Sequence, residues 1–206
     1  MARASRTKGF SMIELIIVIA IIMIMAAAAI PLLGPTLQNY RLRGDARNIA
    51  SLLALARIRA ASDFTRAEVC FDFAGGICTP TSQPNTYQVE LWNKTTNAFA
   101  PEPGTFPQAL SKGDFFPANS VLTAQGIPPT GGQTTIGQGT GVPGPPVASV
   151  QIIFNSRGIA IDPVTLNPVG TDAIYISNTT AYCAVTASLA GQTATWRYVS
   201  NAWSQM

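Results

Sequence analysis

Residues 10–33 read FSMIELIIVIAIIMIMAAAAIPLL, and Glu14 is the one charged side chain among them. At a rise of 1.5 Å per residue, a helix of this length measures about 36 Å, which is enough to cross the hydrocarbon core of a bilayer. The stretch therefore predicts a membrane-spanning helix. The residues before it include Arg3, Arg6 and Lys8, and basic residues in this position favour the cytoplasmic side.

The apolar pattern continues beyond residue 33 with a different spacing. Apolar side chains recur at intervals of three and four residues, which is typical of an amphipathic helix. They are Leu37, Tyr40, Ile49, Leu52, Leu53, Ala56 and Ala60. We therefore expect one long helix over residues 10–64, about 80 Å in length. Its first part would span a membrane and its second part would pack on a domain.

Residues 65–206 show the alternating, β-branched and aromatic pattern of strands. The segments with this pattern are 67–73, 86–92, 149–154, 173–177, 182–189 and 195–199. Residues 126–146 hold seven glycines and five prolines, which predicts a surface loop. The expected fold class is α+β: a long N-terminal helix packed on a C-terminal antiparallel, β-sandwich-like domain.

The composition excludes several classes of enzyme. The chain has 206 residues and no histidine, so catalytic triads and zinc sites that use imidazole are ruled out. Its acidic residues are scattered, without a spacing that indicates shared acid–base work, and no glycine-rich phosphate loop occurs. We therefore expect a non-enzymatic protein without a cofactor.

Charged side chains make up 11% of the residues and are unevenly placed. Residues 41–66 carry six arginines and two aspartates, whereas residues 67–206 carry four basic and seven acidic residues. The net charge of +3 thus comes from the segments that flank the apolar stretch, which suits orientation in a membrane. This positive charge is no evidence that the chain binds nucleic acid, and nucleic acid is not an expected partner.

The junction Lys8-Gly9-Phe10-Ser11-Met12-Ile13-Glu14-Leu15, followed by the apolar run, resembles the class III leader junction of type IV pilins and type II secretion pseudopilins. The resemblance implies that residues 1–9 are a basic leader and that a prepilin peptidase cuts after Gly9. It implies that Phe10 becomes the N-methylated terminus. Glu14 matches the acidic residue five positions into the mature chain, and residues 10–33 would form the filament core after assembly.

Glu14 also needs a physical explanation that is independent of the resemblance. A carboxylate inside an apolar span costs about 2.5–3.5 kcal/mol on insertion scales, so it usually has a partner or a function. The span has no lysine or arginine, but removal of the leader would free the amine of Phe10. We hypothesise that Glu14 pairs with the Phe10 amine of an adjacent subunit and sets the axial register. The alternative is that Glu14 reaches the headgroup interface.

Two other interpretations of the N-terminus stay open. Ala26-Ala27-Ala28 could end a secretory signal peptide. The apolar helix could also be a plain membrane anchor that never assembles.

Pro31 and Pro35 interrupt the helical pattern where the apolar stretch ends. Each proline removes a backbone donor and clashes with the carbonyl four residues before it, so a local kink or unwound turn is expected. Pro31 also matches a frequent helix-kinking proline of the pilin family.

The three cysteines are Cys70, Cys78 and Cys183. A domain beyond the inner membrane lies in an oxidising compartment, where disulfides form. Cys70 and Cys78 enclose a Gly75-Gly76 turn and could close a small loop, which leaves Cys183 free. A Cys70–Cys183 pair is the alternative if their strands are neighbours. Metal binding is not expected, because CxxC spacing and histidines are both absent.

Two further patterns are candidates for binding. Asp162 and Asp172 flank a loop and could help to hold a calcium ion, as in some major pseudopilins. Arg197 could form a basic and aromatic surface that stacks on single-stranded nucleic acid. Its aromatic members would be Trp196, Tyr198 and Trp203. The alternatives are solvated surface charges and an ordinary core strand.

Downstream segments resemble the H-type pseudopilin and its minor-pilin relatives, in which a turn such as Phe154 to Gly158 precedes the final strands. The resemblance implies a structural subunit, a minor pilin or H-type pseudopilin, of a type IV pilus or a type II secretion pseudopilus. A major pilin and a DNA-binding minor pilin for DNA uptake are the alternatives.

The resemblance also implies partners and a location. The partners are other pilin or pseudopilin subunits, the prepilin peptidase, an inner-membrane platform protein and an assembly ATPase. The location is the bacterial inner membrane, crossed once with the globular domain in the periplasm, and then the filament.

Overall fold

A computed structural model of the chain describes residues 10–73, 75–76, 78, 83–117, 149–162, 165–168 and 171–206. Within this part, nothing is said of the side chains of residues 28–33, 149–150 and 171. The expected leader with Gly9 and the expected loop at 126–146 lie outside the described residues. The chain divides into two compact units, Met1–Leu37 and Gln38–Met206.

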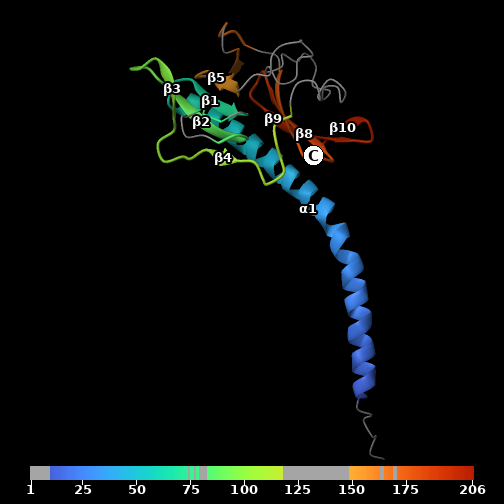
Figure 1. Cartoon of the computed structure of the whole chain (residues 1–206). Coiled ribbons are helices and arrows are strands. Elements are labelled where there is room, and N and C mark those ends of the chain that lie inside the picture. Colours follow the sequence, from blue (N-terminus) through green and yellow to red (C-terminus); the bar gives the residue numbers. More distant parts are fainter. Residues whose placement is uncertain are drawn as a thin grey trace, which may run out of the picture. The chain divides into compact units, whose positions relative to one another are not determined.

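A long helix precedes all the strands of the described structure (Figure 1). This helix, α1, spans Met12–Ser62. The strands are β1 (Ala67–Asp72), β2 (Thr86–Asn93), β3 (Ala98–Pro101), β4 (Gln108–Ala109), β5 (Ser149–Phe154), β6 (Ala160–Ile161), β7 (Thr171–Ser177), β8 (Tyr182–Ser188), β9 (Thr193–Val199) and β10 (Ala202–Gln205).

The strands form two antiparallel sheets. The first has the order β3-β2-β1-β5-β6, and β4 pairs with β2 beyond this path. The second has the order β10-β9-β8-β7. A helix with antiparallel sheets confirms the expected α+β class.

The second part of α1 covers the inner faces of both sheets. Its core residues recur at intervals of four and three and are each at most 1% exposed: Leu42, Ala46, Ile49, Leu53, Ala56 and Ala60. They share one apolar cluster with Phe71 and Ile152 of the first sheet and with Ile174 and Val185 of the second. Burial of each large aliphatic or aromatic side chain contributes about 1.5–3 kcal/mol. The helix therefore joins the two sheets into one core.

Leu37 and Tyr40 do not belong to this buried stripe, although the sequence spacing placed them there. They are 54% and 66% exposed. Leu37 lies in the first unit, and the stripe that contacts the sheets begins at Leu42. The expectation was wrong because the three- and four-residue spacing continues past the point where the helix meets the domain.

The six expected strand segments all overlap observed strands, β1, β2, β5, β7, β8 and β9. The sequence did not predict β3, β4, β6 and β10. Each of these has only two to four residues, and alternation over so short a segment does not distinguish a strand from a loop.

The helix continues through Pro31 and Pro35 without a break. The prolines therefore do not end or unwind α1. That they kink it stays a prediction.

A tight contact joins one turn from each sheet to α1. Gly158 lies in the turn after β5 and Gly191 in the turn after β8, with φ values of 71° and 70°. A Cβ added at Gly191 would lie 2.5 Å from the carbonyl oxygen of Gly158 and 2.7 Å from Cδ and Nε of Arg57. The Arg57 side chain of α1 thus lies against both turns, at a distance that only glycine allows.

We expect Gly191→Ala to destabilise the domain more than Gly104→Ala. Both changes place alanine at a positive φ, which costs about 1–2 kcal/mol. A Cβ at Gly104 meets no atom within 4 Å, whereas at Gly191 it adds an overlap worth about 1–3 kcal/mol. Urea unfolding of the full chain in a nonionic detergent, followed by circular dichroism, measures the difference. Equal losses for the two variants would contradict the contact.

Candidate assembly site in the N-terminal helix

The first turn of α1 is organised by Ser11 and Glu14. Ser11 directly precedes the first helical residue, and its carbonyl accepts a hydrogen bond from the backbone N–H of Leu15 at 3.2 Å. Ser11 is therefore the N-cap, and Glu14 stands three residues later in the first turn. This Ser-x-x-Glu spacing is that of a capping box, and an acidic side chain here also interacts favourably with the helix dipole.

The Ser-x-x-Glu spacing is compatible with a second role for Glu14, as a helix-capping residue, which the sequence analysis did not consider. The signal was present in the sequence as Ser11-Met12-Ile13-Glu14. A local capping role and a pairing role with a neighbouring subunit both use the same carboxylate, so an experiment on Glu14 has to separate them.

Large apolar side chains at the start of the chain are unpartnered in this structure. The exposed fraction of each lies between 46% and 82%. They are Phe10, Met12, Ile13, Leu15, Ile16, Ile17, Val18, Ile19, Ile21, Ile22, Met23, Ile24 and Met25. They point in all directions around the helix, as expected for a segment whose apolar residues are nearly continuous rather than on one stripe. An apolar surface of this extent needs a partner.

No basic side chain of the apolar segment can neutralise Glu14. The sequence has no lysine or arginine between Lys8 and Arg41, and Arg41 is about 40 Å farther along the helix. The amine that a cut after Gly9 would create lies on Phe10, about 6 Å of helical rise from Glu14. It would be the one cation of this segment.

A family model described as the prokaryotic N-terminal methylation motif matches residues 4–30. The chain carries this motif. The match confirms the resemblance to the type IV pilins and pseudopilins, and it supports a pilin-like substrate of prepilin peptidase that assembles with other pilin subunits. Because the motif ends at residue 30, it does not distinguish an H-type pseudopilin from other pilins. No curated protein and no solved structure matches the chain.

The motif also supports a membrane-anchored, pilus-associated protein. Among the residues with described side chains, no helix is both long and apolar enough to count as a membrane span.

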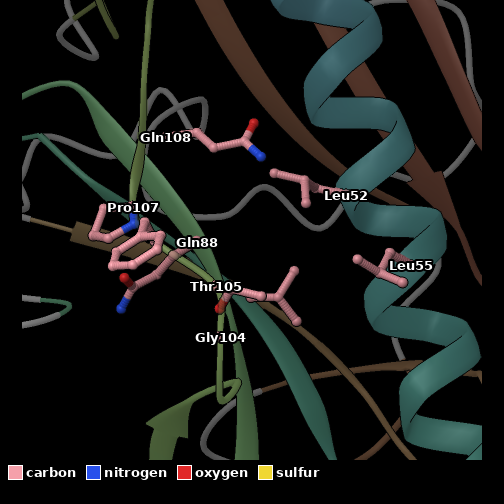
Figure 2. Close-up of a pocket in the computed structure, with 9 residues that line it drawn as sticks. Leu52, Leu55, Gln88, Gly104, Thr105, Pro107 and Gln108 are labelled. Carbon is pink, nitrogen blue, oxygen red and sulfur yellow. The ribbon is translucent and has the colours of Figure 1, made fainter.

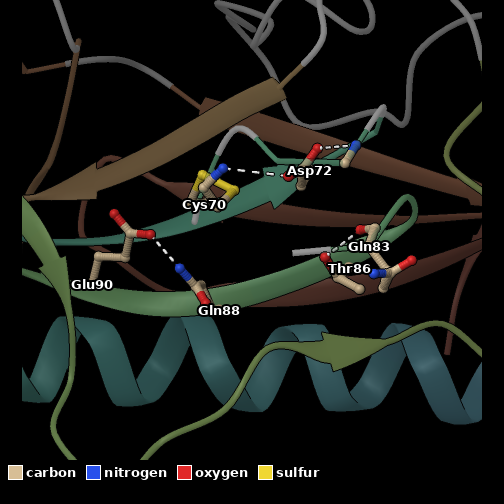
Figure 3. Close-up of a disulfide and its surroundings, with 8 residues drawn as sticks. Cys70, Asp72, Gln83, Thr86, Gln88 and Glu90 are labelled. Carbon is tan, nitrogen blue, oxygen red and sulfur yellow. Dashed lines mark hydrogen bonds between the residues drawn. A yellow bond between two sulfur atoms is a disulfide. The ribbon is translucent and has the colours of Figure 1, made fainter. Parts of the chain in front are cut away.

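A disulfide joins Cys70 of β1 to Cys78, with the two Cα atoms 5.8 Å apart (Figure 3). This is the pairing that the sequence favoured. Asp72 supports the same loop, since its carboxylate accepts the backbone N–H groups of Gly75 at 2.6 Å and Cys78 at 3.3 Å. Cys183 is a buried free thiol, and burial raises its pKa to about 12. It therefore stays protonated and unreactive at neutral pH.

Buried polar side chains lie beside this disulfide, on the face of the first sheet that points away from α1. Glu68 and Glu90 are directly opposite on β1 and β2, and Gln88 donates a short hydrogen bond to Glu90. All three are at most 5% exposed. Burial, and next the neighbouring Glu90, raises the pKa of Glu68 to about 9. Glu68 is therefore protonated at neutral pH in the folded chain.

This pair of carboxyls makes the stability depend on pH. Glu68 keeps its proton in the folded chain while the unfolded chain releases it near its ordinary pKa of 4.5, so the free energy of unfolding falls as the pH rises from about 4.5 to about 9. We expect Glu68→Gln to flatten this decline, because the amide keeps a donor and has no proton to lose. Melting temperatures of the full chain across this range test it.

Asp63→Asn is the control for that series, since Asp63 is exposed and should leave the slope unchanged. A wild-type slope that Glu68→Gln does not alter would contradict the assignment of the buried proton to Glu68.

Burial, and next the neighbouring Asp162, raises the pKa of Asp172 to about 7, so the two acidic side chains of the calcium interpretation lie near each other. Within the part of the chain that the structure describes, no third ligating side chain forms a group with them. The Asp162 carboxylate accepts the N–H and the hydroxyl of Thr165, at 2.7 and 3.0 Å, which closes a local turn. Among the described residues, the one group of three metal-ligating side chains contains Cys70, Cys78 and Glu90, and its two cysteines are joined in the disulfide.

The candidate basic and aromatic surface near the C-terminus does not form, which leaves the alternative of an ordinary strand. Trp196 and Tyr198 lie on one face of β9, and Tyr198 contacts Trp203 with ring centroids 5.3 Å apart. Arg197 lies between them in sequence and therefore on the opposite face of the strand. The alternation of a strand separates the charge from the aromatic rings.

A mostly apolar pocket of about 390 Å³ lies between α1 and the segment before β4 (Figure 2). Leu52 and Leu55 line it from the helix, and Gln88, Thr105 and Gln108 are among the residues opposite. None of its lining residues is titratable, so the pocket offers no group for acid–base chemistry.

Proposed function

We propose that the chain is a non-enzymatic structural subunit that is cut between Gly9 and Phe10, N-methylated on Phe10 and assembled through α1 into a filament. The observation that carries the proposal is the coincidence of the methylation motif at residues 4–30 with the exposed apolar side chains from Phe10 to Met25. Processing frees an amine beside Glu14, and assembly covers the apolar side chains. The protein needs no cofactor for either step.

Before assembly, we place residues 10–33 in the bacterial inner membrane in a single pass. The basic residues Arg3, Arg6 and Lys8 favour a cytoplasmic leader. The unit Gln38–Met206 would then lie in the periplasm, which fits the Cys70–Cys78 disulfide. A secretory signal peptide or a plain anchor would account for the apolar stretch but leaves the match to the methylation motif unexplained.

In the filament, the apolar side chains of one subunit pack against those of others, and Glu14 pairs with the Phe10 amine of a neighbour. Direct partners are other pilin or pseudopilin subunits and the prepilin peptidase. An inner-membrane platform protein and an assembly ATPase act on the chain before or during assembly.

Within the family, we favour a minor pilin or an H-type pseudopilin of a type IV pilus or type II secretion pseudopilus. The support is the Phe154 to Gly158 turn, whose glycine contacts Arg57 of α1. A major pilin is the second candidate, and the amount of this chain in sheared filaments separates the two. A role in DNA uptake is disfavoured, because Arg197 and the aromatic residues lie on opposite faces of β9.

The proposed cleavage and methylation can be tested directly. When the full chain is expressed together with a prepilin peptidase, we expect a mature chain that starts at Phe10 and is one methyl group heavier than residues 10–206. Intact-mass measurement and N-terminal sequencing of the membrane extract check this. Gly9→Leu should leave the chain uncut. A wild-type chain that starts after Ala28, or one that keeps Met1 in the presence of the peptidase, would refute the proposal.

Two variants of Glu14 separate its possible role in helix capping from its proposed pairing with the amine of a neighbouring subunit. Glu14→Gln keeps the capping-box side chain but loses the charge, whereas Glu14→Ala loses both. If the carboxylate pairs with an amine, both variants should be processed normally. The amount of each in sheared filaments should fall at least about tenfold relative to the wild type, as expected when the free energy of assembly loses about 1.4 kcal/mol or more. Immunoblots of the sheared fraction measure this.

Asp63→Asn provides a matched control, since it removes an exposed acidic side chain just after the other end of α1. It should assemble like the wild type. Normal assembly of Glu14→Gln, with a defect only in Glu14→Ala, would assign Glu14 to helix capping and contradict the pairing.

A further inference from the structure

The surface of the unit Gln38–Met206 is more basic than its composition suggests. Seven of its nine acidic side chains are buried: Asp45, Glu68, Asp72, Glu90, Glu102, Asp114 and Asp172. None of its ten arginines and lysines is buried. Burial also raises the pKa of Glu68 to about 9 and those of Asp114 and Asp172 to about 7, which removes further negative charge near neutral pH.

Three of the arginines converge on one pocket. The pocket has a volume of about 270 Å³ and lies between α1 and the β9–β10 hairpin. Arg43 and Arg47 line it from the helix, and Arg197 lines it from β9. Val199, Ser204 and Met206 complete the lining. Arg43, Arg197 and the carboxyl of Asp114 all act electrostatically on the buried thiol of Cys183, which places these three groups near one point. Because burial raises the pKa of Asp114 to about 7, its carboxyl neutralises the two guanidinium groups only in part at neutral pH.

None of these three arginines forms an ion pair within the described part of the chain. The one ion pair found there joins Arg59 to Glu102, at 2.6 Å, and Nε of Arg43 is buried without a hydrogen-bond partner. Arg43 and Arg47 are one helical turn apart, where like charges repel and destabilise the helix. Three guanidinium groups without an ion pair around one pocket are stabilised when an anion binds among them.

We propose that the pocket formed by Arg43, Arg47 and Arg197 is a binding site for a phosphate group. A phosphate monoester carries a charge of about −1.5 to −2 and three terminal oxygens. Guanidinium groups bind such oxygens in bidentate pairs, and the hydroxyl of Ser204 is a further donor in the lining. The charge of phosphate matches three arginines better than the single charge of a carboxylate does.

A second copy of this chain is a poor source of the anion. Among the described acidic residues of this unit, Asp63 is exposed and Asp162 is half-buried, while the others are buried. The surface therefore offers few carboxylates to a neighbouring pocket.

Val199 and Met206, which are 39% and 37% exposed, give the pocket an apolar rim.

A phosphate monoester can reach the pocket from two sources, a free phosphate compound or the headgroup of phosphatidic acid in a membrane. The lipid source rests on the proposed function, which holds the chain at a membrane, whereas the free source does not. Processing at Phe10, read by intact mass on the same preparation, separates failure of the proposed function from failure of the pocket.

The test uses the full chain in a nonionic detergent and calorimetric titration at constant ionic strength. Inorganic phosphate, short-chain phosphatidic acid and acetate are titrated separately against a chloride background. We expect phosphate or phosphatidic acid to bind, and Arg47→Gln and Arg197→Gln each to weaken binding at least tenfold. Lys112→Gln removes an exposed charge from the same unit and should leave binding unchanged.

Melting temperatures of the variants show whether each one is folded, and Arg197→Lys, which keeps the charge but loses the planar fork, should bind with intermediate strength. Tighter binding of phosphatidic acid than of phosphate identifies the lipid source, and the reverse identifies the free source. No binding of either, equal binding by acetate, or equal weakening by Lys112→Gln would overturn the proposal. Binding of a single-stranded oligonucleotide that phosphate does not displace would also overturn it.

Discussion

The structure depends on the different burial of the two parts of α1. Most backbone groups of a helix are satisfied within the helix itself, so the two parts differ chiefly in which side chains they carry and in what covers those side chains. Between Leu42 and Ala60 the apolar stripe is buried against two sheets of the same chain. From Phe10 to Met25 the apolar side chains remain exposed. At about 25 cal/mol per Å², such a surface is stable only against lipid or other apolar helices, so the chain is incomplete alone.

The sequence predicted the fold class and the long helix because both follow from local periodicity. The stripe of the second part of α1 and the alternation in β1 and β8 need no knowledge of the rest of the chain. The short strand β4 and the exposure of Tyr40 could not be predicted in this way. They depend on where the helix meets the sheets, which is a property of the assembled fold. The contact of Gly191 with Arg57 likewise joins turns that the sequence keeps apart.

The candidate site was predictable to different degrees. Phe10 and Glu14 stand in a contiguous motif, so the residues to which we assign the assembly chemistry could be named from the sequence alone. The capping-box spacing of Ser11 and Glu14 was also readable, but the charge of Glu14 in an apolar segment drew the interpretation toward the membrane alone. Arg197 was misassigned because its neighbours in sequence lie on the other face of β9. Its spatial partners, Arg43 and Arg47, come from a helix some 150 residues earlier in the chain.

The surface of the unit Gln38–Met206 is more basic than its composition suggests, because most of its acidic side chains are buried. The acidic side chains are used inside the domain: Asp72 holds the loop at Cys78, and Asp45 accepts both the N–H and the hydroxyl of Ser111, at 2.7 and 3.0 Å. A carboxylate can be buried where several N–H and O–H groups donate to it, because these hydrogen bonds offset the loss of its hydration. An arginine keeps its charged end in water while its stem packs. A nearly balanced composition therefore folds into a basic surface, and the three arginines of the pocket are left to bind an anion from outside the chain.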